Sequence, residues 1–292
     1  MTIPNTNDKT ANSPRLVSFL NAGTLRDLPK NSALQGVSLD GRYQAIQAAG
    51  FTGVQDGDAE ACQQLGLNRA GSGRINVPSE VEPLVESHLS QGFVASTLHV
   101  GWGTEDDSEV DKLLNQINRI SRNYRYPLYI ETHRATITQD SWRTVQMTKR
   151  FPDIRFNGDF SHWYTGHEMV YGDWNAKLEF IKPVLDRVRF LHGRIATPGA
   201  IQAPLSPNPQ SEYIAHFRQI WQCCFTGFLA SATTGDYLIF APELLPPSIY
   251  YAQTHLEPSG APQESSDRWQ DALFLKQIAE EEFANARANR TH

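Results

Sequence analysis

The chain has 292 residues, of which 40% are hydrophobic and 20% are charged, and its formal net charge at pH 7 is −6. This composition is ordinary for a globular protein in water, and no apolar run approaches the roughly 18 residues that a transmembrane helix needs. The negative charge also opposes the binding of a polyanion such as DNA, and the sequence has no basic run that would form a local patch for it. These features exclude neither an enzyme nor a binding protein, but they disfavour membrane-spanning and nucleic-acid-binding classes.

The first fourteen residues, MTIPNTNDKTANSP, are polar and lack the apolar stretch of a secretory signal. We therefore predict that residues 1–14 are a mobile tail on a cytoplasmic protein. The three cysteines, Cys62, Cys223 and Cys224, are too few for a disulfide scaffold, and the adjacent pair lies within an apolar helical pattern. A cysteine-based zinc site is accordingly not expected.

Short β-prone runs alternate with helical stretches along the chain. Seven of these runs predict strands: RLVSFL (15–20), FTGVQ (51–55), FVASTLHVG (93–101), PLYIE (127–131), IRFNGD (154–159), VRFLHGR (188–194) and YLIFAPE (237–243). A weaker eighth run, LNRAGSG (67–73), lies between the second and the third of them, and its glycine and arginine content is unusual for a buried strand.

Helical patterns occupy the segments between these runs. DSEVDKLLNQINRISRNY (107–124) is typical, with apolar residues near three-to-four spacing, and most such segments begin with a capping Ser, Asp or Asn. A last helical segment, SSDRWQDALFLKQIAEEEFANA (265–286), closes the chain. Eight β-then-α units without a linker-like change of composition predict one domain, a (β/α)8 TIM barrel over residues 15–292. A doubly wound open sheet is the alternative, but no G-x-G-x-x-G follows the first strand.

The last four predicted strands each end in a side chain that can bind a metal. These side chains are Glu131 in PLYIE, Asp159 in IRFNGD, His192 in VRFLHGR and Glu243 in YLIFAPE. The carboxyl ends of barrel strands open at one mouth, so the four are expected to converge. Three carboxylates and one imidazole form an oxygen-rich set that suits one Mn²⁺, Mg²⁺, Co²⁺ or Zn²⁺ ion. For any single member, a helix cap or an ion pair with an arginine is the alternative.

This pattern resembles the xylose isomerase-like barrels, a family that includes sugar epimerases, hydroxypyruvate isomerase, inosose dehydratase and the endonuclease IV enzymes. The similarity consists of a Glu, an Asp followed three residues later by His, a His in HGR and a Glu at the final strand, and it covers about residues 93–245. The resemblance implies that Glu131, Asp159, His192 and Glu243 are the ligands of one divalent ion. It also implies that Glu131 and Glu243 exchange protons with the substrate on its opposite faces.

Two further residues follow from the same resemblance. His162, three residues after Asp159, would lie just outside the metal ligands and hold a substrate hydroxyl. Arg194, two residues after His192, would place a cation near the developing oxyanion.

Other side chains near the predicted strand ends are candidates for substrate contact. His99 could touch substrate or a second metal, and a structural role is the alternative. Arg134 could clamp a carboxylate or phosphate, or form a salt bridge within its own loop. Trp102 and Trp163 could stack on the apolar face of a sugar ring, or pack between loops.

The predicted function is that of a divalent-metal-dependent isomerase or epimerase acting on a sugar or related polyhydroxy ketone through an enediolate. Coordination of the ketose carbonyl and its neighbouring hydroxyl acidifies the adjacent C–H, and a carboxylate on each side can remove and return the proton. A lyase or dehydratase on a keto-sugar or keto-cyclitol is the alternative, because elimination begins from the same enediolate. A barrel that binds metal or sugar without catalysis is a third interpretation.

Two other activities in the family are disfavoured. An endonuclease IV-like nuclease needs added histidines near strand three, which LNRAGSGR lacks, and an Asp-x-His after strand seven, where Leu205 and Pro207 stand instead. A two-metal hydride shift needs further carboxylates, which are missing from ATPGAIQAPL. The expected partner is thus a small polyhydroxylated molecule rather than nucleic acid or membrane, and a homo-oligomer is compatible with the sequence.

Overall fold

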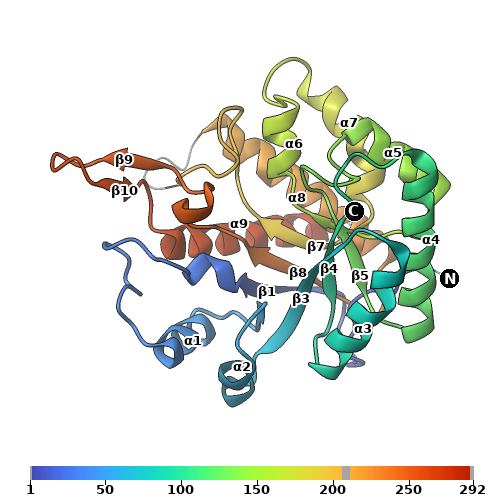
Figure 1. Ribbon diagram of the computed structural model, residues 1–292, viewed down its shortest axis with the longest axis horizontal. Helices are drawn as coiled ribbons and strands as arrows, with labels where there is room; N and C mark the ends of the chain where they lie inside the picture. The colour runs from blue at the N-terminus through green and yellow to red at the C-terminus, as the bar shows by residue number, and fades with distance from the viewer. Residues whose placement is uncertain (1, 206–210, 290–292) are drawn as a thin grey trace.

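The computed structural model describes residues 2–205 and 211–289, and within them eight parallel strands form a closed barrel (Figure 1). The strands are β1 (Arg15–Asn21), β2 (Gly53–Gln55), β3 (Asn68–Ile75), β4 (Ser96–Val100), β5 (Leu128–Glu131), β6 (Phe156–Gly158), β7 (Val188–Gly193) and β8 (Tyr237–Pro242). They pair in chain order, and β1 pairs with both β2 and β8, which closes the ring. The predicted (β/α)8 TIM barrel is confirmed, including its weakest strand.

Helices follow the strands and surround the barrel (Figure 1). They are α1 (Leu39–Ala48), α2 (Ala59–Leu65), α3 (Val81–Ser90), α4 (Asp107–Tyr124), α5 (Ser141–Arg150), α6 (Ser161–Gly166), α7 (Trp174–Leu185), α8 (Glu212–Ser231) and α9 (Arg268–Ala288). In α4, Asp106 and Glu109 form a reciprocal cap at the first turn, and one face of the helix is buried against the barrel. The short helix α6 was not predicted, because it has no side-chain N-cap and its six residues carry no helical period.

Strand β3 tolerates its glycines because they face the helix layer. A Cβ atom added at Gly71 would lie 2.5 Å from Cδ2 of Phe93 and 2.9 Å from Cε1 of His88. One added at Gly73 would lie 2.2 Å from Leu84. The glycines that made this run look unlike a strand therefore allow larger side chains to approach the strand closely.

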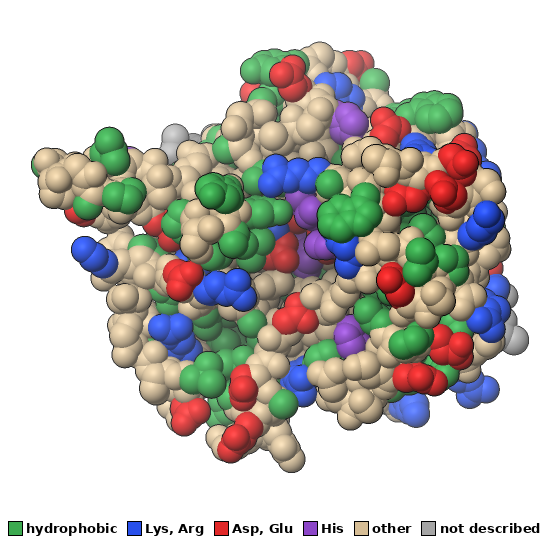
Figure 2. All heavy atoms as spheres, viewed as in Figure 1, with side chains coloured by type: hydrophobic (Ala, Val, Ile, Leu, Met, Phe, Trp, Pro, Cys, Tyr) green, Lys and Arg blue, Asp and Glu red, His purple; other side chains and the backbone are tan. Residues whose placement is uncertain are grey.

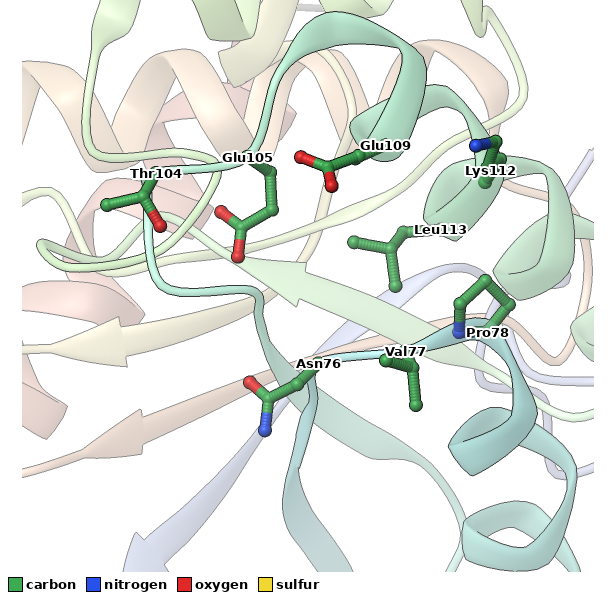
Figure 3. A pocket seen from close by; sticks show the side chains of 8 residues that line it. All are labelled: Asn76, Val77, Pro78, Thr104, Glu105, Glu109, Lys112 and Leu113. Carbon is green, nitrogen blue, oxygen red and sulfur yellow. The ribbon is translucent and has the colours of Figure 1, made fainter.

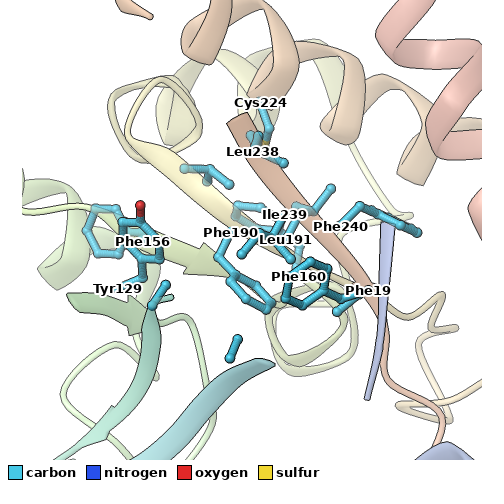
Figure 4. Close-up of a cluster of buried hydrophobic side chains, with 14 of the residues drawn as sticks. Phe19, Tyr129, Phe156, Phe160, Phe190, Leu191, Cys224, Leu238, Ile239 and Phe240 are labelled. Carbon is cyan, nitrogen blue, oxygen red and sulfur yellow. The ribbon is translucent and has the colours of Figure 1, made fainter. Parts of the chain in front are cut away.

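Alternation along the strands places an apolar layer beneath a polar one inside the barrel. Phe19, Tyr129 and Phe190 are buried, and Figure 4 shows their rings in the barrel core. Phe190 stands two residues before His192 on the same face, and the two ring centroids are 5.6 Å apart. The core thus supports the polar side chains at the strand ends from below.

The N-terminal segment differs from the expected mobile tail, because it packs against the barrel. Ile3 is only 1% exposed, and its backbone N–H donates to the carbonyl of Asp153. The backbone N–H of Thr6 donates to the hydroxyl of Tyr129 at 2.8 Å, and Asn7 bridges to Asp236. Burial of one apolar side chain and these hydrogen bonds attach a segment whose composition alone indicates disorder.

A two-stranded antiparallel hairpin, β9 (Thr254–Leu256) and β10 (Pro262–Glu264), projects from the chain between β8 and α9 (Figure 1). Sequence periodicity did not predict it, because each strand has three residues and β9 is exposed. Among the described residues, no helix combines the length and hydrophobicity needed to cross a bilayer.

We predict that Gly71→Ala lowers the free energy of unfolding by about 1–3 kcal/mol, because the added methyl group would overlap the buried rings of Phe93 and His88. Thermal or urea unfolding measures the change. Gly166→Ala is the control, since a Cβ there meets no atom within 4 Å. Equal stability of the two variants would contradict the packing assigned to β3.

Candidate metal centre

Four side chains from consecutive strand ends meet at the mouth of the barrel. Glu131, Asp159, His192 and Glu243 each offer one ligand atom, and these atoms all lie within 4.8 Å of one another. His192 Nδ1 lies 3.6 Å from Glu131 Oε2 and 3.4 Å from Glu243 Oε2. The convergence expected from the strand ends is therefore present in the structure.

The buried atoms of this cluster have unmet bonding capacity. Asp159 is fully buried, and within the described part of the chain its Oδ2 atom accepts no hydrogen bond. Both ring nitrogens of His162, 4% exposed, are also without a hydrogen-bond partner there. Asp159 Oδ2 has ion-pair neighbours, Arg194 Nη2 at 3.3 Å and His162 Nε2 at 3.4 Å, and a metal cation would supply the direct bond that this buried oxygen lacks. Three carboxylates and one imidazole at this spacing fit a single divalent ion with a preference for oxygen ligands.

Amide side chains hold the proposed ligands in place. Asn157 Nδ2 donates to Glu131 Oε2 at 3.1 Å and lies 3.2 Å from His192 Nδ1. Gln55 Oε1 lies 2.8 Å from His192 Nε2. Such contacts orient metal ligands and are as much a part of a metal site as the ligands themselves.

A third amide, that of Asn21, donates to Glu243 Oε1 at 3.0 Å. None of the three amides was predicted from the sequence, because an amide at an inward-facing strand position is not by itself typical of a catalytic or metal-binding group. The available signal was a polar residue at an inward-facing position of a buried strand, as Asn157 is, two residues before Asp159.

Electrostatic pairing keeps the buried carboxyl groups ionised. Burial by itself raises the pKa of Glu131, but His99 and His192 outweigh it and hold this pKa well below its ordinary value. Burial likewise raises the pKa of Asp159, and the Arg194 guanidinium, with His162, more than reverses the effect.

The pKa of the His192 imidazole, at the centre of the cluster, shifts in the opposite direction. Burial lowers the pKa of His192, but Glu243 and Glu131 outweigh burial and raise it to about 9. A protonated His192 would thus place positive charge next to these carboxylates.

Arg194 is the main fixed cation of the cluster. Its Nη2 atom donates to Glu243 Oε2 and lies 3.3 Å from Asp159 Oδ2, while Nε donates to the carbonyl of Glu243 at 2.9 Å. The side chain is 1% exposed. These contacts place it beside two of the four proposed ligands, as the predicted role near an oxyanion requires.

Three histidines line one side of the cluster. His99 Nε2 lies 3.1 Å from Glu131 Oε1, and its ring centroid is 4.2 Å from that of His133. His133 in turn lies 3.9 Å from the ring centroid of His162, whose Nε2 is 3.4 Å from Asp159 Oδ2. His99, Glu131 and His133 also form a second group with ligand spacing. His99 and His162 thus both lie next to the cluster, and the substrate contacts expected of them stay predictions.

The two tryptophans predicted as sugar platforms differ. Trp102 is 55% exposed and lies over the Arg74 guanidinium, 4.0 Å from its ring centroid. Trp163 is 1% exposed, donates through Nε1 to the Thr138 carbonyl at 2.8 Å and packs on Phe160. The burial and contacts of Trp163 fit the alternative stated for it, packing between loops, whereas the exposed ring of Trp102 is free of such burial.

The mouth is visible on the face shown in Figure 2, where histidine and acidic side chains lie in a hollow beside basic and hydrophobic ones. A separate pocket of about 500 Å³ lies outside the barrel, with Asn76 and Val77 on one wall and Glu105 and Glu109 on the other (Figure 3). Its two carboxylates accept hydrogen bonds from backbone N–H groups, Glu105 from Trp102 and Glu109 from Asp106. They are used in loop and cap structure, so the mouth is the better candidate site.

The chain is similar to known proteins in its fold. No protein-family model matches the chain, and no curated protein matches it. Among solved structures, an L-ribulose 3-epimerase superposes with a TM-score of 0.58 at 10% identity, covering 94% of this chain and 97% of the other. A xylose isomerase-like TIM barrel protein from Mycobacterium smegmatis, in complex with magnesium, gives 0.53 at 12% identity, covering 92% and 97%. This chain shares its (β/α)8 barrel fold with both proteins.

A further structure with this barrel fold extends the range of chemistry among the similar proteins. The probable 3-DHS dehydratase AsbF from Bacillus anthracis superposes with a TM-score of 0.50 at 13% identity, covering 78% of this chain and 92% of the other. The (β/α)8 barrel fold of this chain is therefore shared with proteins described as an epimerase and as a probable dehydratase.

We predict that Asn157→Ala weakens the binding of Mn²⁺ or Zn²⁺ by about 10–100-fold, because Glu131 and His192 lose the amide that orients them. Calorimetric titration of metal-stripped protein measures the affinity. Asn118→Ala is the matched control, since Asn118 is also buried but lies on α4. Unchanged affinity in Asn157→Ala would remove Asn157 from the site.

Proposed function

We propose that the protein is a divalent-metal-dependent isomerase or epimerase of a sugar or a related polyhydroxy ketone. The observation that carries the proposal is the meeting of Glu131 and Glu243 around His192, with the four ligand atoms within 4.8 Å of one another. The fold shared with an L-ribulose 3-epimerase supports the same class of reaction. The mouth accordingly combines a place for one cation with two carboxylates that can exchange protons.

The two glutamates come from well separated strands. Glu131 ends β5 and Glu243 follows β8, so a substrate above His192 would have one carboxylate on each side. Asn157 and Asn21 each donate to one of the two carboxylates, which fixes their orientation. One glutamate can then remove a proton from the carbon next to the carbonyl, and the other can return a proton to the opposite face.

A divalent ion held by Glu131, Asp159, His192 and Glu243 would supply Lewis-acid polarisation of the substrate carbonyl. The surrounding residues of the chain provide the rest of the chemistry. His162, whose ring nitrogens form no hydrogen bond among the described residues, can hold a substrate hydroxyl. Arg194 can stabilise negative charge that develops on a substrate oxygen, and its burial strengthens that interaction.

Dehydration of a keto-sugar or keto-cyclitol is the second candidate. The structural similarity to a probable 3-DHS dehydratase supports it. The first step is the same proton removal by a glutamate, and elimination follows only if a group protonates the leaving hydroxyl. We propose that a protonated His162, which is paired with Asp159 Oδ2 at 3.4 Å, would donate that proton.

We predict that Glu131→Gln and Glu243→Gln each lower turnover by roughly 10²–10⁴-fold, because neither amide can accept the transferred proton. A panel of ketoses and keto-cyclitols is incubated with the metal-loaded protein in D₂O, and deuterium at the carbon next to the carbonyl is measured by NMR. Exchange with retained hydroxyls indicates isomerisation or epimerisation, and exchange with loss of water indicates dehydration.

The surface variant Glu281→Gln is the control for this experiment, since Glu281 pairs with Arg218 far from the mouth in the α8 and α9 layer. Full exchange in either active-site variant would contradict the acid/base assignment. Absence of metal-dependent exchange across the panel in the unaltered protein would favour a barrel that binds without catalysis.

A further inference from the structure

The mouth of the barrel carries more fixed positive charge than a neutral sugar needs. Three arginines, Arg74, Arg134 and Arg194, form an arginine rim: Arg74 and Arg194 act on the proposed ligands, and Arg134 lies beside Tyr251, as Arg194 does. Arg74 lies on the inward-facing side of β3 and is paired with His99 of β4 in the strand register. Its positive charge interacts with Glu131. Arg194 contacts Glu243 and Asp159 directly.

Aromatic rings hold the arginine rim in place. The guanidinium carbon of Arg194 lies 4.6 Å from the ring centroid of Tyr251, and that of Arg134 lies 5.3 Å from the same centroid. Arg74 has the equivalent contact with Trp102. Tyr251 belongs to the loop between β8 and the projecting hairpin, so two cations from different loops are gathered beside one ring.

Two of the rim cations have unused donors. Arg194 Nη1 is buried and, among the described residues, donates to no acceptor. Arg134 is exposed, and its side chain forms no salt bridge within residues 2–205 and 211–289. A buried guanidinium N–H group without a partner indicates that something outside the chain accepts from it.

The sum of the charges at the mouth also indicates that an anionic group binds there. The three guanidinium groups of the arginine rim equal the three carboxylates of Glu131, Asp159 and Glu243 in number. Glu105 adds a fourth carboxylate, since its charge also acts on Arg74, so a divalent ion would leave one positive charge without compensation at the mouth. A neutral ketose would not balance this charge, whereas one anionic group would.

We propose that the substrate carries an anionic group, a carboxylate or a phosphate, which binds between Arg194 and Arg134 beside Tyr251. This inference rests on the proposed function, because it concerns the molecule that reacts at the same mouth. Both anions present oxygen acceptors that a guanidinium group can bind through two hydrogen bonds. The proposed substrate is thus an acidic or phosphorylated polyhydroxy compound rather than a neutral sugar.

Two matched pairs of compounds test the proposal by calorimetric titration of the metal-loaded protein. D-gluconate and D-glucitol differ in a carboxylate, and fructose 6-phosphate and fructose differ in a phosphate. The anionic member of at least one pair is expected to bind roughly tenfold or more tightly than its neutral partner. Preference in the first pair assigns a carboxylate, and preference in the second assigns a phosphate. Equal affinities within both pairs would overturn the proposal.

Variants separate a specific contact from a general effect of charge. Arg134→Gln is expected to reduce the preference for the anion roughly fivefold and leave the neutral affinity unchanged, and Arg134→Lys should retain most of the preference. Arg119→Gln is the control, since Arg119 is also exposed but lies on α4 with Gln116 as its partner. Loss of affinity for both members of a pair in Arg134→Gln would contradict the assignment.

The proposed function and this inference can fail separately. Glu131-dependent exchange on a neutral ketose, together with equal affinities in both pairs, would keep the isomerase and overturn the anionic substrate. An anion preference that depends on Arg134, without exchange on any substrate, would keep the binding site and remove the reaction.

Discussion

The arrangement at the barrel mouth depends on one constraint, the burial of carboxylates close to one another. Glu131 and Asp159 are 3% and 0% exposed, and isolated ionised carboxylates in such positions would be strongly destabilising. Arg194, His192 and His99 supply the opposing charge, and the pKa values of both carboxyl groups lie below their ordinary values as a result. Because these buried carboxylates stay ionised, they can bind a cation without first losing a proton.

The sequence predicts the fold well because a (β/α)8 barrel repeats one local pattern. Buried β-prone runs, capped helices and regular spacing agree at every unit, so even the glycine-rich strand β3 follows from the others. The structural features that the sequence does not predict are those without hydrophobic periodicity. The N-terminal segment is fixed by a few contacts such as Ile3 with the barrel bottom, and the hairpin β9 and β10 is too short and exposed to leave a hydrophobic signal.

The site is predictable in part for a similar reason. Residues that end strands are brought together by the topology, so Glu131 and Glu243 converge although they lie 112 positions apart in the sequence. Some side chains matter because of what they touch, such as Asn157 beside Glu131 and Tyr251 beside Arg194. The order of the strands does not identify them, because only the folded geometry shows these contacts. The burial of Trp163 likewise depends on loop packing that a sequence pattern does not specify.

The central claim is that the four strand-end side chains bind one ion. Anomalous scattering from crystals soaked in Mn²⁺ tests it most directly. We predict one strong peak with Glu131, Asp159, His192 and Glu243 in contact, at oxygen and nitrogen distances of about 2.0–2.3 Å. A peak elsewhere, or no peak while Arg194 remains against Glu243 and Asp159, would contradict the account and leave the mouth a closed network of ion pairs.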